Sequence, residues 1–247
     1  MKDQIDAKDA RRVISNWKNS GWLPEQAGLH CESQLEERIL KVYQAYQQEL
    51  RTANALDFDD LLLLTKELFA KHPAVLAKWQ DQFRHVLVDE AQDTNTIQFE
   101  LIRQLVGTQA ILTLIGDDYQ SIYRRRGAVM ENFLRVEQLW PSIKMFKLET
   151  NYRSLPHIVA AGNSIIQHNK RQYDKQLRAH RTGNQHIRIF EFADEIDEAA
   201  QIIELITKLK EEQQRSRNDF TVLYRTNAQS SPFEQILLTE GIPYQIV

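Results

Sequence analysis

Apolar residues recur at helical intervals through the N-terminal part of the chain. Ser33 and Glu36 have the spacing of a capping box, and the apolar residues that follow return every three or four positions: Ile39, Leu40, Tyr43, Tyr46 and Leu50. A second helix is predicted from Phe58 to Ala70, because Asp57 can cap its start and Pro73 stops its continuation. The pattern therefore predicts that the N-terminal part is helical.

Three acids at the start of the second predicted helix have two interpretations. Asp57, Asp59 and Asp60 could belong to a binding site. Acids in a first helical turn also interact favourably with the helix dipole, whether or not they bind anything. The sequence favours this structural interpretation.

The pattern changes after Phe83. HVLVDE (85–90) and AILTLIGDD (110–118) are short apolar runs that end in acids, which is typical of strands buried on both faces of a sheet. The segment between them carries an apolar helical stripe and a glycine placed as a C-cap, namely Ile97, Leu101, Leu105 and Gly107. This β-α-β pattern predicts two parallel strands joined by a right-handed crossover.

The alternation of strands and helices continues to the end of the chain. Further strands are predicted at residues 143–149, 186–192, 220–225 and 243–247. Further helices are predicted at residues 156–169, 196–214 and 231–241, with Pro156 in a first turn and Gly241 at a helix end. Alternation of this kind is typical of an α/β fold.

Composition and charge set the broad class. In a chain of 247 residues, 42% hydrophobic and 26% charged residues are ordinary for a globular protein. The net charge of -3 does not indicate a nucleic-acid-binding protein, although a local basic patch could serve as one. Cys31 is the only cysteine, so no internal disulfide can form, which suits a reducing compartment. Without a signal peptide or an apolar run approaching roughly 20 residues, we expect a soluble cytoplasmic protein.

Carboxylates follow both strands of the predicted β-α-β unit. Ligands of open parallel sheets bind beyond the carboxyl ends of the strands, where Asp89 and Glu90 would lie close to Asp117 and Asp118. Carboxylates tolerate such proximity when a cation such as Mg²⁺ lies beside them. An Asp that holds Mg²⁺ on a nucleotide, beside a Glu that activates water, is the usual arrangement for phosphoryl transfer. On this segment alone, a solvated acidic turn is the alternative.

Five motifs that occur in one order favour the phosphoryl-transfer site over the solvated turn. They are VDEAQDTN (88–95), LIGDDYQSIYRRRGA (114–128), LETNYRS (148–154), LYRTNAQS (223–230) and GIPYQIV (241–247). Together they resemble the superfamily 1 DNA helicases of the UvrD/Rep/PcrA group, and the resemblance extends from about residue 56 to the last residue.

The resemblance implies an α/β fold with partial parallel-sheet motor domains of the P-loop NTPase (RecA-like) type. Residues 1–82 would form a helical subdomain (1B-like). Residues 83–141 would form part of the first RecA-like ATPase domain (1A-like), and residues 142–247 the front part of the second (2A-like).

The resemblance also assigns ATP and Mg²⁺ to named residues. Asp89 would coordinate the Mg²⁺ of ATP, and Glu90, a second candidate metal ligand, would activate the hydrolytic water. Gln120 would sense the γ-phosphate, Arg153 would reach that phosphate from the second motor domain, and Tyr152 would stack on the adenine. A cation supplied across a domain cleft is worth roughly 10³–10⁵ in rate in related NTPases.

The same resemblance places a single-stranded DNA groove around SIYRRRGA. Tyr123 and Arg126 would line it, and Arg225 and Asn227 would contact it from the second domain. Arg125 replaces the tryptophan usual in the family, and an arginine can stack on a base only in part. The implied partners are single-stranded DNA, single-strand/duplex junctions, and proteins of DNA repair or replication.

One motif of the family is missing. The phosphate-binding loop GxxxxGK[ST] does not occur in these 247 residues, so we expect a central part of a longer helicase that does not hydrolyse ATP efficiently by itself. Two alternatives stay open. One is a non-catalytic module that binds single-stranded DNA or a protein. The other is a metal-dependent nuclease using the four acids, which would need a lysine or further acids around them.

Overall fold

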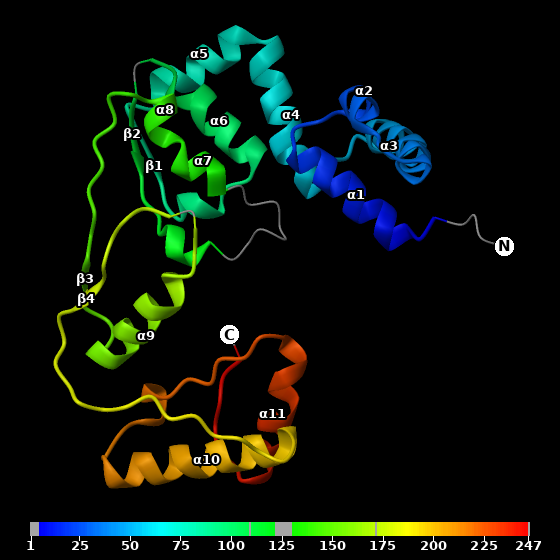
Figure 1. Cartoon of the computed structure of the whole chain (residues 1–247). Coiled ribbons are helices and arrows are strands. Elements are labelled where there is room, and N and C mark those ends of the chain that lie inside the picture. The colour runs from blue at the N-terminus through cyan, green and yellow to red at the C-terminus, as the bar shows by residue number, and fades with distance from the viewer. Residues whose placement is uncertain (1–4, 109, 122–129, 171, 247) are drawn as a thin grey trace. The chain divides into compact units, whose positions relative to one another are not determined.

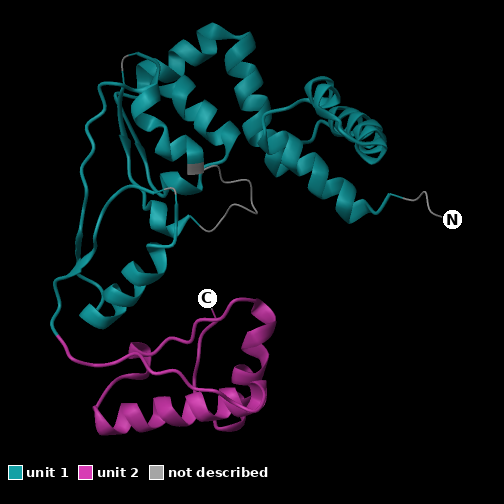
Figure 2. Cartoon of the chain, in the orientation of Figure 1, with its two compact units in different colours: residues 1–182 teal, residues 183–247 magenta. Residues whose placement is uncertain are grey.

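The computed structural model describes residues 5–108, 110–121, 130–170 and 172–246 (Figure 1). The chain forms two compact units, residues 1–182 and residues 183–247 (Figure 2). Helices predominate, and the described strands form two small parallel sheets. The motif-based division after residues 82 and 141 stays a prediction.

The predicted N-terminal helical region is confirmed. It begins with α1 (Ala7–Asn19), the short α2 (Pro24–Ala27) and α3 (Gln34–Thr52). Their buried faces meet in one core, formed by Ala10, Ile14, Trp17, Ala27, Ile39 and Tyr43. Half of the predicted capping box forms at α3. The backbone N–H of Glu36 donates to Ser33 Oγ, but the Glu36 carboxylate accepts from Glu32 instead of Ser33.

The second predicted helix is confirmed as α4 (Phe58–Lys71), and α5 (Pro73–Gln82) follows it directly. Pro73 ends the first helix and opens the next, because the first turn of a helix does not need the N–H that proline lacks. Asp57 caps α4 as predicted.

The acids at the start of α4 are part of the packing between helices. The amino group of Lys18 in α1 lies 2.7 Å from an Asp57 oxygen and 2.8 Å from an Asp60 oxygen. Lys18 and Asp60 are completely buried. Burial by itself would raise the pKa of Asp57, but hydrogen bonds from Lys18 and from the Asp60 backbone hold it below its usual value. The structure thus agrees with the structural interpretation of these acids.

The predicted β-α-β unit is also confirmed. Strand β1 (His85–Val88) pairs in parallel with β2 (Ile111–Leu114), and α6 (Thr96–Val106) connects them. Asn95 caps α6, and Gly107 ends it with a φ of 51°, a conformation that favours glycine. The register places Val88 opposite Leu114, so the two strands end at the same edge of the sheet.

The prediction that these strands are buried on both faces is wrong. Figure 1 shows α6 on one side of the strands, and α6 packs against β1. The alternate side chains Leu87 and Ile111 are 66% and 58% exposed. A sheet of two strands with a helix on one side leaves its other face in water, although the sequence is apolar at consecutive positions.

The chain between the two sheets contains α7 (Met130–Leu134) and α8 (Val136–Leu139). The strand predicted at residues 143–149 is wrong, because pairing begins only at β3 (Thr150–Asn151). Strand β3 pairs in parallel with β4 (Arg178–Ala179), and α9 (Pro156–Ile166) lies between them in sequence. The helix predicted at residues 156–169 is therefore confirmed, with Pro156 at its first position.

Unit 2 contains α10 (Glu195–Glu212) and α11 (Ser230–Thr239), which pack against each other. Both predicted helices are confirmed, and Gly241 follows α11 with a φ of 65°. The strands predicted at residues 186–192, 220–225 and 243–247 are wrong in the described part of the chain. An apolar sequence shows that a segment could form a strand, but a strand also needs a neighbouring strand to which its backbone can hydrogen-bond.

Within the described ranges, every helix is too short or too polar to cross a bilayer.

Candidate functional site

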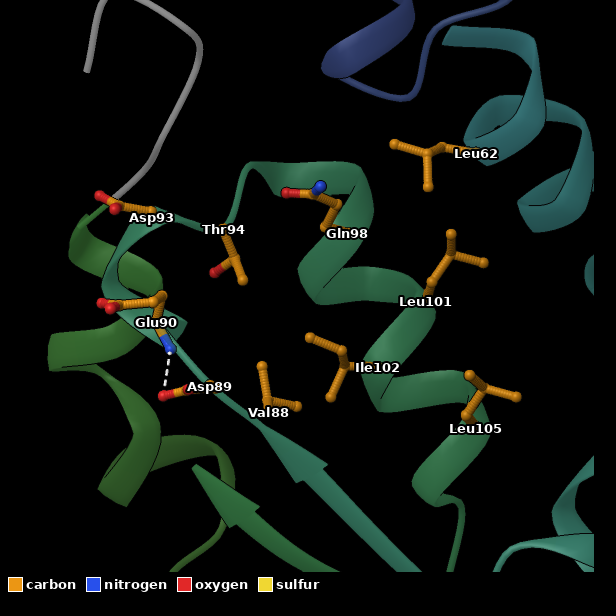
Figure 3. A pocket seen from close by; sticks show the side chains of 10 residues that line it. All are labelled: Leu62, Val88, Asp89, Glu90, Asp93, Thr94, Gln98, Leu101, Ile102 and Leu105. Carbon is orange, nitrogen blue, oxygen red and sulfur yellow. Dashed lines mark hydrogen bonds between the residues drawn. The ribbon is translucent and has the colours of Figure 1, made fainter. Parts of the chain in front are cut away.

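The candidate site begins where β1 ends. Asp89 and Glu90 follow Val88 directly, and both are exposed. Glu90 has φ 50° and ψ 40°, the left-handed conformation, which costs about 1 kcal/mol or more for a residue with a side chain and is concentrated at functional sites. The Asp89 carboxylate accepts a hydrogen bond of 3.0 Å from the Glu90 N–H (Figure 3). A sharp, strained turn therefore presents two carboxylates at the edge of the sheet.

A pocket of about 400 Å³ adjoins this turn (Figure 3). Its apolar lining includes residues of α6 such as Leu105, and its polar lining consists of Asp89, Glu90, Asp93, Thr94 and Gln98. The volume is within the range of small-molecule sites. An acidic wall repels phosphate, however, so an anionic ligand could bind beside it only together with a cation.

Asp93 lies close enough to Glu90 for the two carboxylates to repel each other. Burial, and then the charge of Glu90, raise the pKa of Asp93 above its usual value. Among the described residues no hydrogen-bond donor reaches its buried Oδ1 atom. A cation near the turn would therefore relieve an unfavourable local charge.

Gln92 joins the end of β1 to the end of β2. The side chain is buried, with 1% of its surface exposed. Its Nε2 donates to Glu90 Oε2 over 2.7 Å, and its Oε1 accepts from the Asp117 N–H over 3.0 Å. A Cβ atom at Gly116 would lie 2.6 Å from this Oε1 atom, so the glycine leaves the space that the Gln92 amide occupies.

The second acidic pair has its own cation. Lys175 Nζ lies 2.6 Å from a carboxylate oxygen of Asp117 and 2.6 Å from one of Asp118. Gln120 is exposed and donates from Nε2 to the other Asp117 oxygen over 2.8 Å. Burial would raise the pKa of Asp117, but the hydrogen bonds from Lys175 and Gln120 lower it. The positive charge expected beside this pair is thus a lysine of the same chain.

Tyr152 and Arg153 lie just after β3, and both are exposed. The Tyr152 ring lies 4.8 Å from the His180 ring, measured between centroids. The backbone of Arg153 is fixed by Asn151 Oδ1, which accepts from its N–H, and by Arg181, which donates to its carbonyl. No hydrogen bond or ion pair among the described residues joins either side chain to the acids after β1.

The predicted DNA-contacting residues are only partly described. Tyr123, Arg125 and Arg126 lie outside the described residues. Arg225 and Asn227 belong to unit 2 and are exposed. They lie on a turn before α11, in which Gln229 Oε1 accepts hydrogen bonds from the backbone N–H groups of Arg225 and Thr226.

The donor set is consistent with magnesium held mainly by a ligand. In the described part of the chain, no three His, Cys, Asp or Glu side chains cluster closely enough to hold a metal ion. Mg²⁺ typically takes one or two carboxylates, together with waters and substrate phosphates. The exposed Asp89–Glu90 pair meets that requirement.

The sequence interpretation missed two residues of this network, Gln92 and Lys175. Gln92 lies inside the motif VDEAQDTN, and its place between two acids was the available signal. Lys175 carried no local signal, because it lies 57 positions after Asp118 in the chain.

Comparisons with known proteins match both parts of the chain. Residues 1–141 match the family described as "UvrD/REP helicase N-terminal domain", and residues 146–247 match "UvrD-like helicase C-terminal domain". The chain is 39% identical over 245 residues to the ATP-dependent DNA helicase PcrA of Leuconostoc citreum, covering 99% of this chain and 33% of that protein. It is 36% identical over 244 residues to the ATP-dependent DNA helicase Rep of Escherichia coli (strain K12), covering 99% and 36%. The chain therefore spans about a third of the length of these curated relatives.

Proposed function

Because the chain belongs to the UvrD/REP helicase family, we propose that it forms the central part of an ATP-dependent DNA helicase. The whole protein would couple ATP hydrolysis to movement along single-stranded DNA and to duplex unwinding. The observation that carries the proposal is the strained turn at the end of β1, which presents Asp89 and Glu90 and is connected through Gln92 to the loop of Gln120.

In this proposal the two carboxylates have different roles. Asp89 and Glu90 would hold the Mg²⁺ of ATP, which supplies positive charge to the phosphates. Glu90 would also accept a proton from the attacking water. The Gln92 amide donates to one oxygen of Glu90, and in this proposal the other oxygen would accept from that water. Gln120, which is exposed beside the same turn, would contact the γ-phosphate.

The rest of the nucleotide site would come from the two motor domains. Tyr152 and Arg153, exposed on the turn after β3, would supply the adenine stack and the cation that stabilises the transition state. The two small parallel sheets support a P-loop NTPase type of core. The division into residues 1–82, 83–141 and 142–247 is part of this proposal.

The proposed partners are single-stranded DNA and its junctions with duplex DNA, in the cytoplasm, with proteins of repair or replication. Exposure of Arg225 and Asn227 on one turn supports a contact with a nucleic-acid backbone. Tyr123, Arg125 and Arg126 would also contact single-stranded DNA.

The nuclease alternative loses support. The lysine that it required is present as Lys175, but two aspartates engage its amino group. No three-ligand metal cluster is found among the described residues. A non-catalytic module that binds single-stranded DNA or a protein remains the second candidate, because the exposed Arg225 and Asn227 could serve such binding without ATP turnover.

The test is Glu90→Gln in the full-length protein that contains this chain. Loss of a general base typically lowers turnover by about 10²–10⁴-fold. We expect DNA-stimulated ATP hydrolysis to fall by that order, whereas binding of a fluorescent ATP analogue stays close to wild type. Glu211→Gln, at an exposed position on α10, is the matched control. Turnover within a few-fold of wild type in the Glu90 variant would contradict the assigned role.

A further inference from the structure

A continuous series of polar contacts extends from Glu90 to a distant lysine. Glu90 accepts from Gln92, and Gln92 accepts from the Asp117 backbone. The Asp117 carboxylate accepts from both Gln120 and Lys175. Every link is a hydrogen bond of 2.6 to 3.0 Å. The proposed base, the proposed phosphate sensor and Lys175 thus share one network.

The segment around Lys175 holds the loop after β2 at several points. Asp118, which is 4% exposed, also receives the Lys175 amino group, and its other oxygen accepts from the Tyr173 N–H over 2.7 Å. The Lys175 amino group lies 4.1 Å from the centre of the Tyr119 ring. The Tyr119 hydroxyl donates back to the Lys175 carbonyl over 2.6 Å. These contacts fix the backbone of both segments as well as their side chains.

The same segment is attached to the turn that carries Arg153. Beyond Lys175, the Gln176 N–H donates to the Glu149 carboxylate over 2.9 Å, and β4 pairs with β3. Strand β3 ends at Asn151, two positions before Arg153. Lys175 therefore lies between the turn that presents Arg153 and the loop that presents Gln120.

We propose that Lys175 is a positioning residue of the ATP site, which holds the Gln120 loop against Glu90 and links it to the Arg153 turn. The inference rests on the proposed function for its role in catalysis, but the mechanical link can be measured without turnover. A displacement of β3 and β4 would move Lys175. The hydrogen bonds of Asp117 and Gln92 would then transmit this movement to Glu90. Lys175 itself contacts neither the nucleotide nor the attacking water in this scheme.

The first measurement is hydrogen–deuterium exchange of the full-length protein with Lys175→Met. We expect faster exchange in peptides covering residues 114–121 and 88–95, because the Asp117 N–H bond to Gln92 loses its support. Lys170→Met changes an exposed lysine of the same segment and should leave both peptides unchanged. Unchanged exchange at residues 88–95 in the Lys175 variant would overturn the link to Glu90, whether or not the protein hydrolyses ATP.

The second measurement separates positioning from folding. With Lys175→Met we expect kcat for ATP to fall about tenfold or more while KM changes little, the pattern of a lost transition-state interaction. Lys175→Arg should recover most of kcat, because it keeps the charge. If Lys175→Met unfolds the protein, the triple variant with Asp117→Asn and Asp118→Asn removes the uncompensated buried charge. Full kcat in the folded triple variant would overturn the positioning role. Absence of turnover in the wild type would instead contradict the proposed function, and the exchange result would still decide the link.

Discussion

Two ion-pair clusters in unit 1 have the same composition, one lysine between two aspartates, but different surroundings. The helical cluster joins α1 to the start of α4, and the sheet-end cluster joins the loop after β2 to the segment before β4. Their members are Lys18, Asp57 and Asp60 in the first and Lys175, Asp117 and Asp118 in the second.

The helical cluster uses its oxygens for the fold. Asp57 and Asp60 cap each other's backbone N–H groups, and Gln47 and Tyr46 donate to them from α3. Lys18 and Asp60 have no exposed side-chain surface. Asp60 is thus enclosed by the helices that it holds together, whereas 26% of the Asp57 side chain is exposed.

The sheet-end cluster is connected by hydrogen bonds to the candidate site. Asp117 accepts from Gln120, which is exposed, and its backbone reaches the strained Glu90 through Gln92. The comparison shows that a lysine between two acids does not identify a site by itself. The other partners of the acids decide whether the cluster only joins helices or is also connected to the candidate site.

The largest effect is expected from Lys18→Met. It leaves a fully buried Asp60 without its cation, and breaking a buried ion pair in this way costs about 3–5 kcal/mol. We expect the free energy of unfolding, measured by urea denaturation with circular dichroism, to fall by that amount. Lys175→Met should cost less, because Lys175 and Asp117 keep some contact with water.

Lys8→Met, at an exposed position on α1, is the control for the helical cluster. The double variant Lys18→Met/Asp60→Asn should recover part of the loss, since it removes the unpaired charge. If Lys18→Met and Lys175→Met lowered the free energy of unfolding equally, the predicted difference between the two clusters would be wrong.

A smaller effect is expected from Gly116→Ala. The added Cβ would lie 2.6 Å from Gln92 Oε1 and 3.1 Å from the Phe133 ring, so the Gln92 amide must move. Overpacking of this kind costs about 1–3 kcal/mol. We expect a lower free energy of unfolding and, in the full-length protein, slower ATP turnover.

Gly162→Ala is the matched control, because no atom of the described residues lies within 4 Å of a Cβ at this position in α9. Replacing a helical glycine by alanine there should stabilise the protein by up to about 1 kcal/mol. If Gly116→Ala changed neither the free energy of unfolding nor ATP turnover, neither property would depend on the observed position of Gln92.

The smallest effect concerns acid stability. The pKa values of Asp57 and Asp117 are both held below the usual 3.8, against the effect of burial, by hydrogen bonds from lysines. A carboxyl whose pKa is lowered by folding contributes stability above its unfolded pKa, and this stability is lost as the pH falls through the folded value. Melting temperatures should therefore decline as the pH drops below about 4.

Asp57→Asn and Asp117→Asn should each make that decline less steep, and Asp81→Asn, at an exposed position on α5, should not. A decline as steep as that of the wild type in either cluster variant would mean that its carboxyl does not gain from the observed ion pair.

Several elements could be predicted because their signals are local. The helix α4 was predicted with its cap at Asp57, and α6 with its cap at Gly107, since capping and periodicity act within a few residues. The parallel β1–β2 pair followed from a β-α-β pattern. The acids after β1 were found in the same way, because they follow an apolar run directly.

Other elements could not be predicted because they depend on neighbours distant in sequence. The segments at residues 143–149, 186–192 and 220–225 are rich in apolar residues, as strands are, but have no described strand partner. The outer face of β1 is exposed although its sequence is apolar at consecutive positions, as Leu87 shows. The hydrophobicity of a segment shows that it could be buried, but it does not show which other segment packs against it.

The sequence by itself determined the main helices, the parallel strand pair and the order of motifs that identifies the family. The helices and the strand pair depend on residues close together in the chain, and each motif is itself a short segment. Only the tertiary structure placed Lys175 between Asp117 and Asp118, and only it showed the left-handed turn at Glu90 and the Gln92 bridge. The physical reason is that a charged side chain is paired with the opposite charge that lies nearest in space. For Asp118 that charge belongs to a lysine 57 positions away in the sequence.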